Sequence, residues 1–404
     1  MGMIGERVLR TEDPDLVMGR GTFIDNLPID GAVHVVFVRS SVAHGRIVSL
    51  DVREAMTMPG VLGVFTHDDL EADGIGPLPI DMPLLPEGIR RSALANGIVR
   101  YVGEPIVAVV AETRPLAVDA VEAVVVEFEP LPVVVDPLEA CSNDVLLFPQ
   151  HGSNVVVDFP AGRTVDFSEC DVVVSQRILN RRIAPSPLEA RVAASRWESA
   201  GPDGVRRLTH WQASQGAHAI RAQIAAFYGI PVEQIRVITP DVGGGFGAKA
   251  FFYPEDMVLP WIARRVDRPV RYTETRTESM NGLGHGRGQV QDVALGGTRD
   301  GRILAYSMDI VQDAGAYPRY GAVLPFMTGR MLTGTYDIPA AAMSARGVVT
   351  NTVPTVAYRG AGRPEAAAAI ERMVDLFAAE IGMDPVEVRR RNLIASDRFP
   401  YKTA

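Results

Sequence analysis

Short apolar runs in the first third of the chain predict a mixed unit of helices and strands. Apolar spacing at helical period predicts helices at 51–56 and 114–123. Residues 71–96 are rich in Gly and Pro and show no period, so we expect a long surface loop there. Together these elements predict an α+β domain over residues 1–140. The expected strands are β-branched runs at 33–38, 47–50, 61–65, 106–111 and 124–128.

Two prolines in residues 131–137 predict a linker, so we place a domain boundary near 137–152 and a second domain at 150–404. Ile220, Ile224 and Phe227 follow helical spacing before Gly229, which predicts a helix with a glycine stop. Two further helices are expected, at 255–263 with an interruption at Pro260, and from Pro364 to Gly382. Strands are expected at 172–174, 176–179, 192–197, 235–239, 289–295 and 303–311.

A glycine-rich loop, Asp241-Val-Gly-Gly-Gly-Phe-Gly-Ala-Lys-Ala250, follows the strand expected at 235–239. Because glycine has no Cβ, such a loop can adopt positive φ and direct several backbone N–H groups at one anionic or oxygen-rich ligand. Phe246 would then be a fixed apolar side chain in an otherwise open cradle. A tight strand-to-helix turn that binds nothing is the alternative.

The two common phosphate-binding motifs do not fit this loop. A Walker loop ends in Gly-Lys-Ser/Thr, whereas Ala248-Lys-Ala250 lacks both the glycine and the hydroxyl. A dinucleotide fingerprint needs G-x-G-x-x-G spacing, whereas Gly243, Gly245 and Gly247 are evenly spaced two residues apart. A nucleotide-dependent transferase is therefore only an alternative.

Composition and charge exclude several classes of protein. With 404 residues, 47% of them hydrophobic and 22% charged, the chain has room for two or more globular domains. Its net charge of −9 and the absence of a basic stripe argue against nucleic-acid binding. It shows no signal-peptide pattern and no 18-residue apolar run, so we expect a cytoplasmic location. Cys141 and Cys170 are too few to ligate an iron–sulfur cluster, so electrons would leave through another polypeptide.

Taken together, three segments resemble the large, molybdenum-binding subunit of the xanthine dehydrogenase/aldehyde oxidase family. They are Gln212-Ala-Ser-Gln-Gly216, Val242-Gly-Gly-Gly-Phe-Gly-Ala-Lys249 and Ala357-Tyr-Arg-Gly-Ala-Gly-Arg-Pro-Glu365. The first 140 residues are similar to the family's α/β hammerhead domain, and the rest to its first molybdopterin-binding domain. The hammerhead likeness lies in Thr22-Phe-Ile-Asp25, Phe37-Val-Arg-Ser40, Ala43-His44 and Arg100-Tyr-Val-Gly-Glu-Pro105.

The resemblance implies specific roles around a molybdenum held by a pterin dithiolene, with no direct protein ligand to the metal. Gln215 would donate a hydrogen bond to an oxo group on molybdenum. The backbone of Gly244, Gly245 and Gly247, with Phe246, would pack against the metal's oxo and sulfido groups.

Arg359, with Gly360 beside it, would lie next to the substrate at the start of a helix, where anionic or oxo ligands bind well. Each assignment has a plain alternative: Gln215 as a helix N-cap, Phe246 as core, and Arg359 as a surface ion-pair partner.

The family reaction that the resemblance implies is hydroxylation with water as the oxygen source, with electrons passing through iron–sulfur clusters to a flavin. The general base is a glutamate in the C-terminal half of the large subunit, and that half lies beyond this chain. We favour a split subunit, inactive without a partner chain that carries the base; a fragment is the alternative. Glu255, Asp256 and Glu365 are weaker local candidates for the base, because acidic residues in a first helical turn are commonly dipole partners.

Three departures from the family pattern narrow the substrate. Tyr358-Arg-Gly-Ala-Gly362 lacks the cysteine that binds copper in carbon monoxide dehydrogenases. Ala250 and Met327 stand where purine-oxidising members place a glutamate and an arginine, and Ala361 stands where they place an aromatic residue. A purine's polar edge would be left unpaired in such a pocket. We therefore expect an aldehyde or an aromatic N-heterocycle, with aldehydes slightly ahead.

The implied cofactor is molybdopterin with Mo, in the cytosine dinucleotide form that bacterial members often use. The implied partners are a C-terminal half molybdenum subunit, a 2Fe-2S subunit and an FAD subunit. A non-catalytic scaffold or assembly subunit of such a complex is the second alternative.

Overall fold

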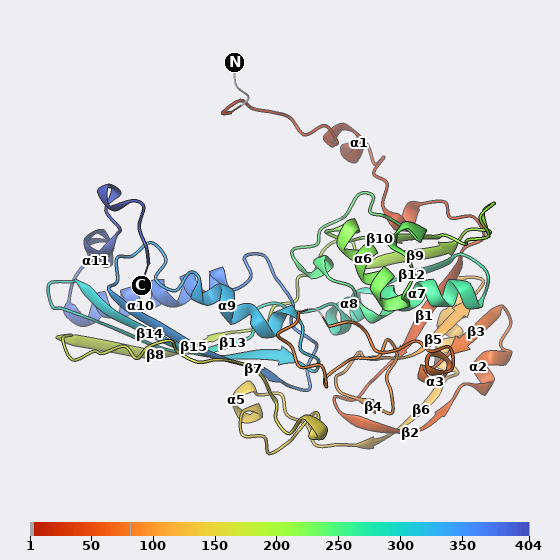
Figure 1. Ribbon diagram of the computed structural model, residues 1–404, viewed down its shortest axis with the longest axis horizontal. Helices are drawn as coiled ribbons and strands as arrows, with labels where there is room; N and C mark the ends of the chain where they lie inside the picture. The colour runs from red at the N-terminus through yellow and green to blue at the C-terminus, as the bar shows by residue number, and fades with distance from the viewer. Residues whose placement is uncertain (1–3, 81, 404) are drawn as a thin grey trace.

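The computed structural model describes residues 4–80 and 82–403 (Figure 1). A seven-stranded sheet with α6 (Ala217–Tyr228) and α7 (Pro254–Arg265) occupies one end of the molecule. A five-stranded sheet with α10 (Arg363–Ile381) occupies the other end, and a three-stranded sheet lies below the first. The fold is mixed α and β, as the sequence pattern predicts.

The seven-stranded sheet combines strands from both predicted domains. Val33 pairs in parallel with Val270, and Val36 pairs in antiparallel register with Val109, so one strand joins the early and late parts of the chain. The predicted division at 137–152 therefore does not separate the sheets. In spatial order the strands are β11 (Ile235–Ile238), β10 (Leu208–Gln212), β9 (Val192–Trp197), β12 (Val270–Thr273), β1 (Val33–Arg39), β5 (Pro105–Ala111) and β3 (Val61–Phe65).

One apolar core fills the space between this sheet and its helices. Phe37 and Phe65 from the early strands lie in the same cluster as Leu208, Ile220 and Trp261 from the later elements. The Phe65 and Trp261 rings meet edge to face with centroids 5.1 Å apart. Burial of these rings ties the two parts of the chain into one unit.

The three-stranded sheet forms a smaller layer beside a second apolar cluster that includes Ile106, Val107 and Val109 of β5. Its strands run β4 (Ile98–Val99), β2 (Gly45–Asp51) and β6 (Val125–Pro130). The other elements of the first 151 residues are the helices α1 (Asp13–Val17), α2 (Arg53–Thr57), α3 (His67–Ala72), α4 (Arg114–Glu122) and α5 (Pro137–Ala140), and the 3-10 turns η1 (Ile24–Asn26) and η2 (Pro149–His151).

The five-stranded sheet is covered by α10, which packs against β8 and β13. Ile370, Val374 and Phe377 are buried along one face of this helix, as its spacing predicts, and Gly382 ends it with φ 69°. The strands run β7 (Val155–Phe159), β15 (Ala340–Val349), β14 (Ile303–Gly315), β13 (Gln289–Gly297) and β8 (Val172–Asn180). The remaining elements are α8 (Arg276–Gly282), α9 (Leu324–Gly329), α11 (Pro385–Asn392), and the 3-10 turns η3 (Val232–Gln234), η4 (Ala248–Ala250), η5 (Tyr320–Val323) and η6 (Ser396–Arg398).

The strands expected at 172–174 and 176–179 form one strand, β8, so the expected break between them is wrong. The segment after α3 is irregular, as predicted, but only part of it lies at the surface, because Leu78, Leu85 and Leu94 are at most 5% exposed; Asp81 lies outside the described residues. Residues 131–136 have no helix or strand and are mostly exposed, as expected of a linker, although the Val134 N–H donates to Asn351 Oδ1 at 3.0 Å.

The helix around Pro260 is continuous, contrary to the predicted interruption. Proline lacks an N–H and disturbs the hydrogen-bond ladder of a helix. The Tyr228 hydroxyl enters the ladder there, donating to the Met257 carbonyl and accepting from the Trp261 N–H. This hydroxyl therefore bridges the backbone groups of Met257 and Trp261 beside the proline.

Across the described residues 4–80 and 82–403, the structure contains no helix that combines the length and the hydropathy needed to cross a membrane.

Candidate functional site

The glycine-rich loop connects β11 to α7, and its backbone is bent sharply at three points. Positive φ values occur at Gly244 (96°), Phe246 (53°) and Gly247 (103°). A Cβ on Gly247 would lie 2.6 Å from the Ala357 carbonyl oxygen, so only glycine fits between the two loops. The loop is held at its start by Asp241, whose carboxylate accepts from the Thr22 N–H at 2.7 Å.

Three consecutive N–H groups of this loop remain free. The N–H groups of Gly244, Gly245 and Phe246 have no hydrogen-bond acceptor among the residues that the structure describes. Successive free N–H groups in a tight turn form a concavity that binds anions or oxygen atoms. The loop therefore has backbone donors available to a ligand.

Gln215 lies against the same loop. Its side-chain oxygen Oε1 accepts from the Gly247 N–H at 2.8 Å, and its backbone N–H donates to the Lys249 carbonyl at 2.9 Å. Because Oε1 is occupied, the amide nitrogen Nε2 is the group left to donate to a ligand. The alternative of Gln215 as a helix N-cap is wrong, since Gly216 caps α6 without a side-chain bond.

Phe246 and Arg359 are neighbours through their backbones. The Arg359 N–H donates to the Phe246 carbonyl at 2.9 Å. Phe246 is 42% exposed, so it is not a core residue. Within the described parts of the chain, the exposed Arg359 side chain makes no ion pair, which removes the surface ion-pair alternative. Gln215, Phe246 and Arg359 therefore lie on adjoining loops, and all three are exposed.

Arg287 holds the loop that carries Arg359 in place. Its guanidinium donates to the Tyr358 carbonyl at 3.1 Å and to the Arg359 carbonyl at 2.8 Å, and it lies 3.3 Å from Glu365 Oε1. The loop backbone turns through Gly360 (φ 98°) into the start of α10. Sequence reasoning missed Arg287, because its partners lie more than 70 positions away in the chain.

The three positions expected to shape the substrate pocket lie on the same two loops or against them. Ala250 closes the η4 turn, where its N–H donates to the Gly247 carbonyl at 3.2 Å. Ala361 is half-buried with φ 41°. Met327 packs beside the second loop, since a Cβ on Gly362 would lie 2.8 Å from the Met327 Cβ.

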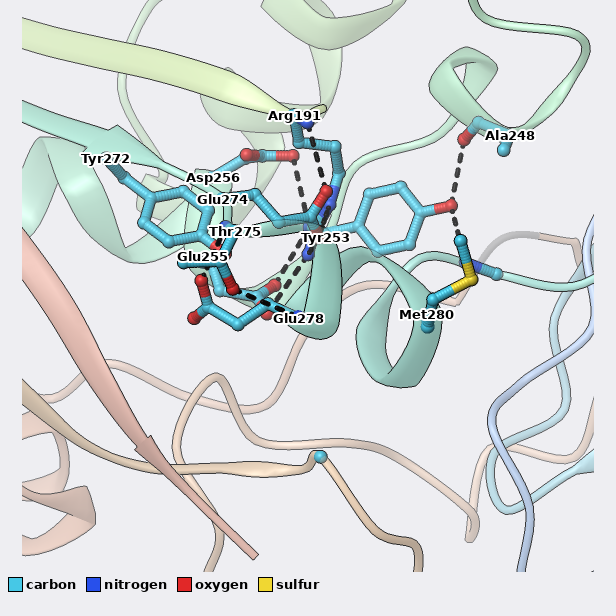
Figure 2. A network of polar contacts seen from close by, with 12 residues as sticks. Arg191, Ala248, Tyr253, Glu255, Asp256, Tyr272, Glu274, Thr275, Glu278 and Met280 are labelled. Atoms are coloured by element: carbon cyan, nitrogen blue, oxygen red, sulfur yellow. Dashed lines mark hydrogen bonds and ion pairs between the residues drawn. The ribbon is translucent and has the colours of Figure 1, made fainter. Parts of the chain in front are cut away.

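A buried ionic cluster is joined through Tyr253 to Ala248, near the end of the glycine loop (Figure 2). Arg191, 2% exposed, is bonded to Glu274 at 2.6 Å and to Glu255 at 3.0 Å, and its guanidinium lies 4.2 Å from the Tyr253 ring centroid. The Tyr253 hydroxyl in turn donates to the Ala248 carbonyl at 2.8 Å. The cluster thus supports the loop from inside the protein.

The three local candidates for the base are held in the interior. Burial alone would raise the pKa of Glu255, but the guanidinium groups of Arg191 and Arg39 lower it below its usual range. Burial raises the pKa of Asp256 to about 7. Glu255 and Asp256 are 1% exposed and Glu365 is fully buried. None of the three faces the open surface, so none of them is placed as a general base.

The donors at this face fit a molybdopterin-type group, which carries oxygen atoms and brings its own metal ligands. The face offers three free backbone N–H groups, one amide and one guanidinium, all of them hydrogen-bond donors. In the described part of the chain, no group of three His, Cys, Asp or Glu side chains is arranged to hold a metal ion. Donors of this kind act on a metal group through its outer atoms.

The fold and these donors are suited to binding a cofactor through backbone and amide groups. Residues 147–393 match the molybdopterin cofactor-binding domain, and residues 18–132 match the aldehyde oxidase and xanthine dehydrogenase a/b hammerhead domain. The chain belongs to this family of molybdopterin-binding proteins.

Individual relatives agree with this assignment. The chain is 36% identical to the nicotine 6-hydroxylase large subunit of Paenarthrobacter nicotinovorans, over 99% of this chain and 49% of that subunit. It is 34% identical to the carbon monoxide dehydrogenase large chain of Hydrogenophaga pseudoflava, over 98% of this chain and 51% of that one. The crystal structure of quinoline 2-oxidoreductase from Pseudomonas putida 86 superposes with a TM-score of 0.92 and 34% identity, over 100% of this chain and 51% of that one.

The chain thus spans about half the length of these relatives. One more distant relative is of similar extent. The nicotinate dehydrogenase large molybdopterin subunit of Eubacterium barkeri is 27% identical, over 96% of this chain and 89% of that subunit.

Proposed function

We propose that this chain is the first half of the molybdenum-binding subunit of a hydroxylase that uses water as its oxygen source. One observation carries the proposal: free N–H groups of Gly244, Gly245 and Phe246 lie beside Gln215 and Arg359 on one open face. Molybdopterin bound there would supply the two-electron oxidation. The family membership supports the choice of cofactor.

In this proposal each side chain has a separate task. Gln215 donates from Nε2 to an oxygen of the cofactor, while its Oε1 stays fixed by Gly247. Phe246 provides an apolar wall that orients the substrate and limits access of water. Arg359 lies beside the substrate, where its positive charge stabilises negative charge that develops on the substrate in the reaction.

The proton acceptor comes from the second half of the subunit, on a partner chain. The buried positions of Glu255, Asp256 and Glu365 support this, because none of these three carboxylates faces the site. The similar extent of the Eubacterium barkeri subunit supports a division into two chains. A 2Fe-2S subunit and an FAD subunit would carry the electrons away, and the pterin would have the cytosine dinucleotide form.

The substrate proposed is an aromatic N-heterocycle, with aldehydes as the second candidate. Ala250, Met327 and Ala361 provide no charge for the polar edge of a purine. The relatives named for nicotine and quinoline act on N-heterocycles, which moves this class ahead of the aldehydes that the sequence favoured. The absence of cysteine from residues 358–362 argues against copper-dependent oxidation of carbon monoxide.

Co-expression of this chain with its genomic neighbours, followed by purification through a tag on this chain, tests the proposal. We expect molybdenum, a pterin dinucleotide, iron and FAD in the purified complex, and oxidation of pyridine- or quinoline-type rings. A complex without molybdenum would identify a scaffold subunit. Efficient oxidation of xanthine, with heterocycles and aldehydes untouched, would contradict the substrate class. ATP binding in a titration would instead favour the transferase alternative.

A further inference from the structure

Glu189, just before β9, contacts both ends of the glycine loop. At the start of the loop, its carboxylate oxygen Oε2 accepts from the Gly243 N–H at 2.9 Å, and its own N–H donates to the Gly243 carbonyl at 3.1 Å. At the end of the loop, the same Oε2 accepts from Lys249 Nζ at 2.8 Å. One carboxylate therefore joins two positions that are six residues apart in the chain.

Lys249 depends on Glu189 for its hydrogen bonds. The lysine is 1% exposed, and both of its acceptors among the described residues belong to Glu189: the carboxylate, and the backbone carbonyl at 2.7 Å. Burial lowers the pKa of Lys249, and the Glu189 carboxylate opposes that shift. A buried ammonium group without a counter-charge is strongly destabilising.

The segment that carries Glu189 is itself fixed closely against the loop. A Cβ on Gly243 would lie 2.5 Å from the Glu189 Cβ, so the two backbones are in direct contact. Arg276 donates to the Pro187 carbonyl at 2.7 Å and to the Leu188 carbonyl at 3.0 Å, which anchors this segment from the other side.

The free N–H groups lie between the two positions that Glu189 holds. Gly243 and Lys249 are fixed by Glu189, Gly247 is fixed by Gln215, and Gly244 to Phe246 are left without acceptors in the described part of the chain. The direction of these free N–H groups therefore depends on how far apart Glu189 holds the two ends of the loop.

We propose that Glu189 is a positioning residue, which holds the two ends of the glycine loop through Gly243 and Lys249 and so aims the free N–H groups at the cofactor. The role toward the cofactor rests on the proposed function. The role toward the loop does not, because it concerns contacts within this chain. Glu189 acts through the loop and does not itself touch the substrate.

The substitution Glu189→Gln tests the proposal, with Asp337→Asn as a control. Asp337 has similar burial, 12% against 11% exposure for the side chain, and is also paired with a cation, Arg302 at 2.9 Å, but its partners lie outside the loop and outside the buried ionic cluster. Hydrogen–deuterium exchange of the purified complex should be about tenfold faster for residues 243–249 in E189Q, with unchanged exchange in β13 and β14. D337N should leave exchange of residues 243–249 as in the wild type.

A double substitution separates positioning from general damage to the fold. In E189Q the Lys249 ammonium keeps only neutral acceptors, so adding Lys249→Met removes the uncompensated buried charge. Slower exchange of 243–249 in E189Q/K249M than in E189Q would support the pairing. Wild-type exchange in E189Q, or equal acceleration throughout the chain, would overturn the proposal.

Molybdenum content of the same samples measures the consequence for the cofactor. We expect E189Q to retain several-fold less molybdenum per complex than D337N. Full molybdenum content in an E189Q complex whose loop exchanges rapidly would overturn the part of the proposal that concerns the cofactor. If the wild-type complex contains no molybdenum, the proposed function fails, while the exchange result still decides whether Glu189 positions the loop.

Discussion

Asp256 is the residue whose chemistry differs most from its ordinary behaviour in water. It is 1% exposed, it accepts a hydrogen bond from Gln212 Nε2 at 3.0 Å, and its second carboxylate oxygen has no partner among the described residues. Burial raises its pKa to about 7, and the nearby carboxylates of Glu255 and Glu274 contribute to that rise against the opposing charge of Arg191. The protonated form of Asp256 is thus favoured in the folded protein.

This raised pKa predicts a pH-dependent stability. A carboxyl group whose pKa is higher in the folded protein than its unfolded value of 3.8 contributes its full stabilisation of the folded state below pH 3.8. This stabilisation is lost as the pH rises through about 7. The loss is at most about 1.4 kcal/mol per pH unit. Asp256→Asn removes this loss. The melting temperature of D256N minus that of the wild type should therefore increase as the pH is raised from 5 to 8.

Thermal unfolding at pH 5, 6, 7 and 8 measures the effect, with Asp292→Asn as the control. Asp292 is half-exposed, and its hydrogen bonds from Arg177 lower its pKa, so it stays charged across this range. The difference between D292N and wild type should be the same at every pH. If the difference in melting temperature between D256N and wild type is also the same at every pH, the raised pKa is contradicted.

Among the elements, α7 shows how a tertiary contact overrides a local rule. Pro260 predicts a break because it removes a donor from the helix. The break is prevented by Tyr228, which lies on another helix and inserts its hydroxyl between Met257 and Trp261. Periodicity and capping residues predicted α6, α10 and their glycine ends, because those signals are local. A partner from a distant element leaves no local signal.

Tyr228→Phe should therefore destabilise the protein by about 1–3 kcal/mol, because it leaves the Trp261 N–H and the Met257 carbonyl without that partner in the interior. Tyr306→Phe is the matched control, since Tyr306 is also buried but its hydroxyl has no partner among the described residues. Chemical denaturation of both variants measures the difference. Equal losses of stability would show that the inserted hydroxyl contributes nothing specific.

At the scale of the whole molecule, the early and late parts of the chain share one sheet and one buried ionic cluster. Arg39 on β1 lies 2.7 Å from Glu255 on α7 and 2.9 Å from Glu278 on α8. Trp261 donates from its indole nitrogen to Asp73 at 2.8 Å. These contacts cross the boundary that composition predicts near 137–152, so the two parts are mutually dependent.

The isolated segment 1–140 should therefore not fold alone. Without β12, β1 loses its parallel partner, and Phe37 and Phe65 lose the apolar side chains around Leu208 and Trp261. Co-expression with residues 141–404 should restore a cooperative unit. Circular dichroism and limited proteolysis check this. A cooperative thermal transition in isolated 1–140 would show an independent domain.

The residues of the candidate site are likewise of two kinds: some are recognised from local sequence motifs, and others only from long-range contacts. Gln215, Phe246 and Arg359 were identified from short motifs, and the structure brings them together through Gly247 and the backbone bond between the two loops. Glu189 was missed, because it is 54 positions from Gly243 and its segment carries no glycine or periodic signal. Short motifs identified the residues proposed to face the ligand, whereas the residues that hold those motifs in place are found only from the fold.

The parallel pairing of Val33 with Val270 has a consequence for synthesis of the chain. Because β1 is translated long before β12, one side of β1 has no partner while the ribosome adds the intervening residues. At roughly 5–20 residues per second, this interval lasts on the order of 10 to 50 s. The nascent N-terminal strands must be kept from pairing with other chains during that time, so production of this protein should respond to the supply of chaperones and to growth temperature.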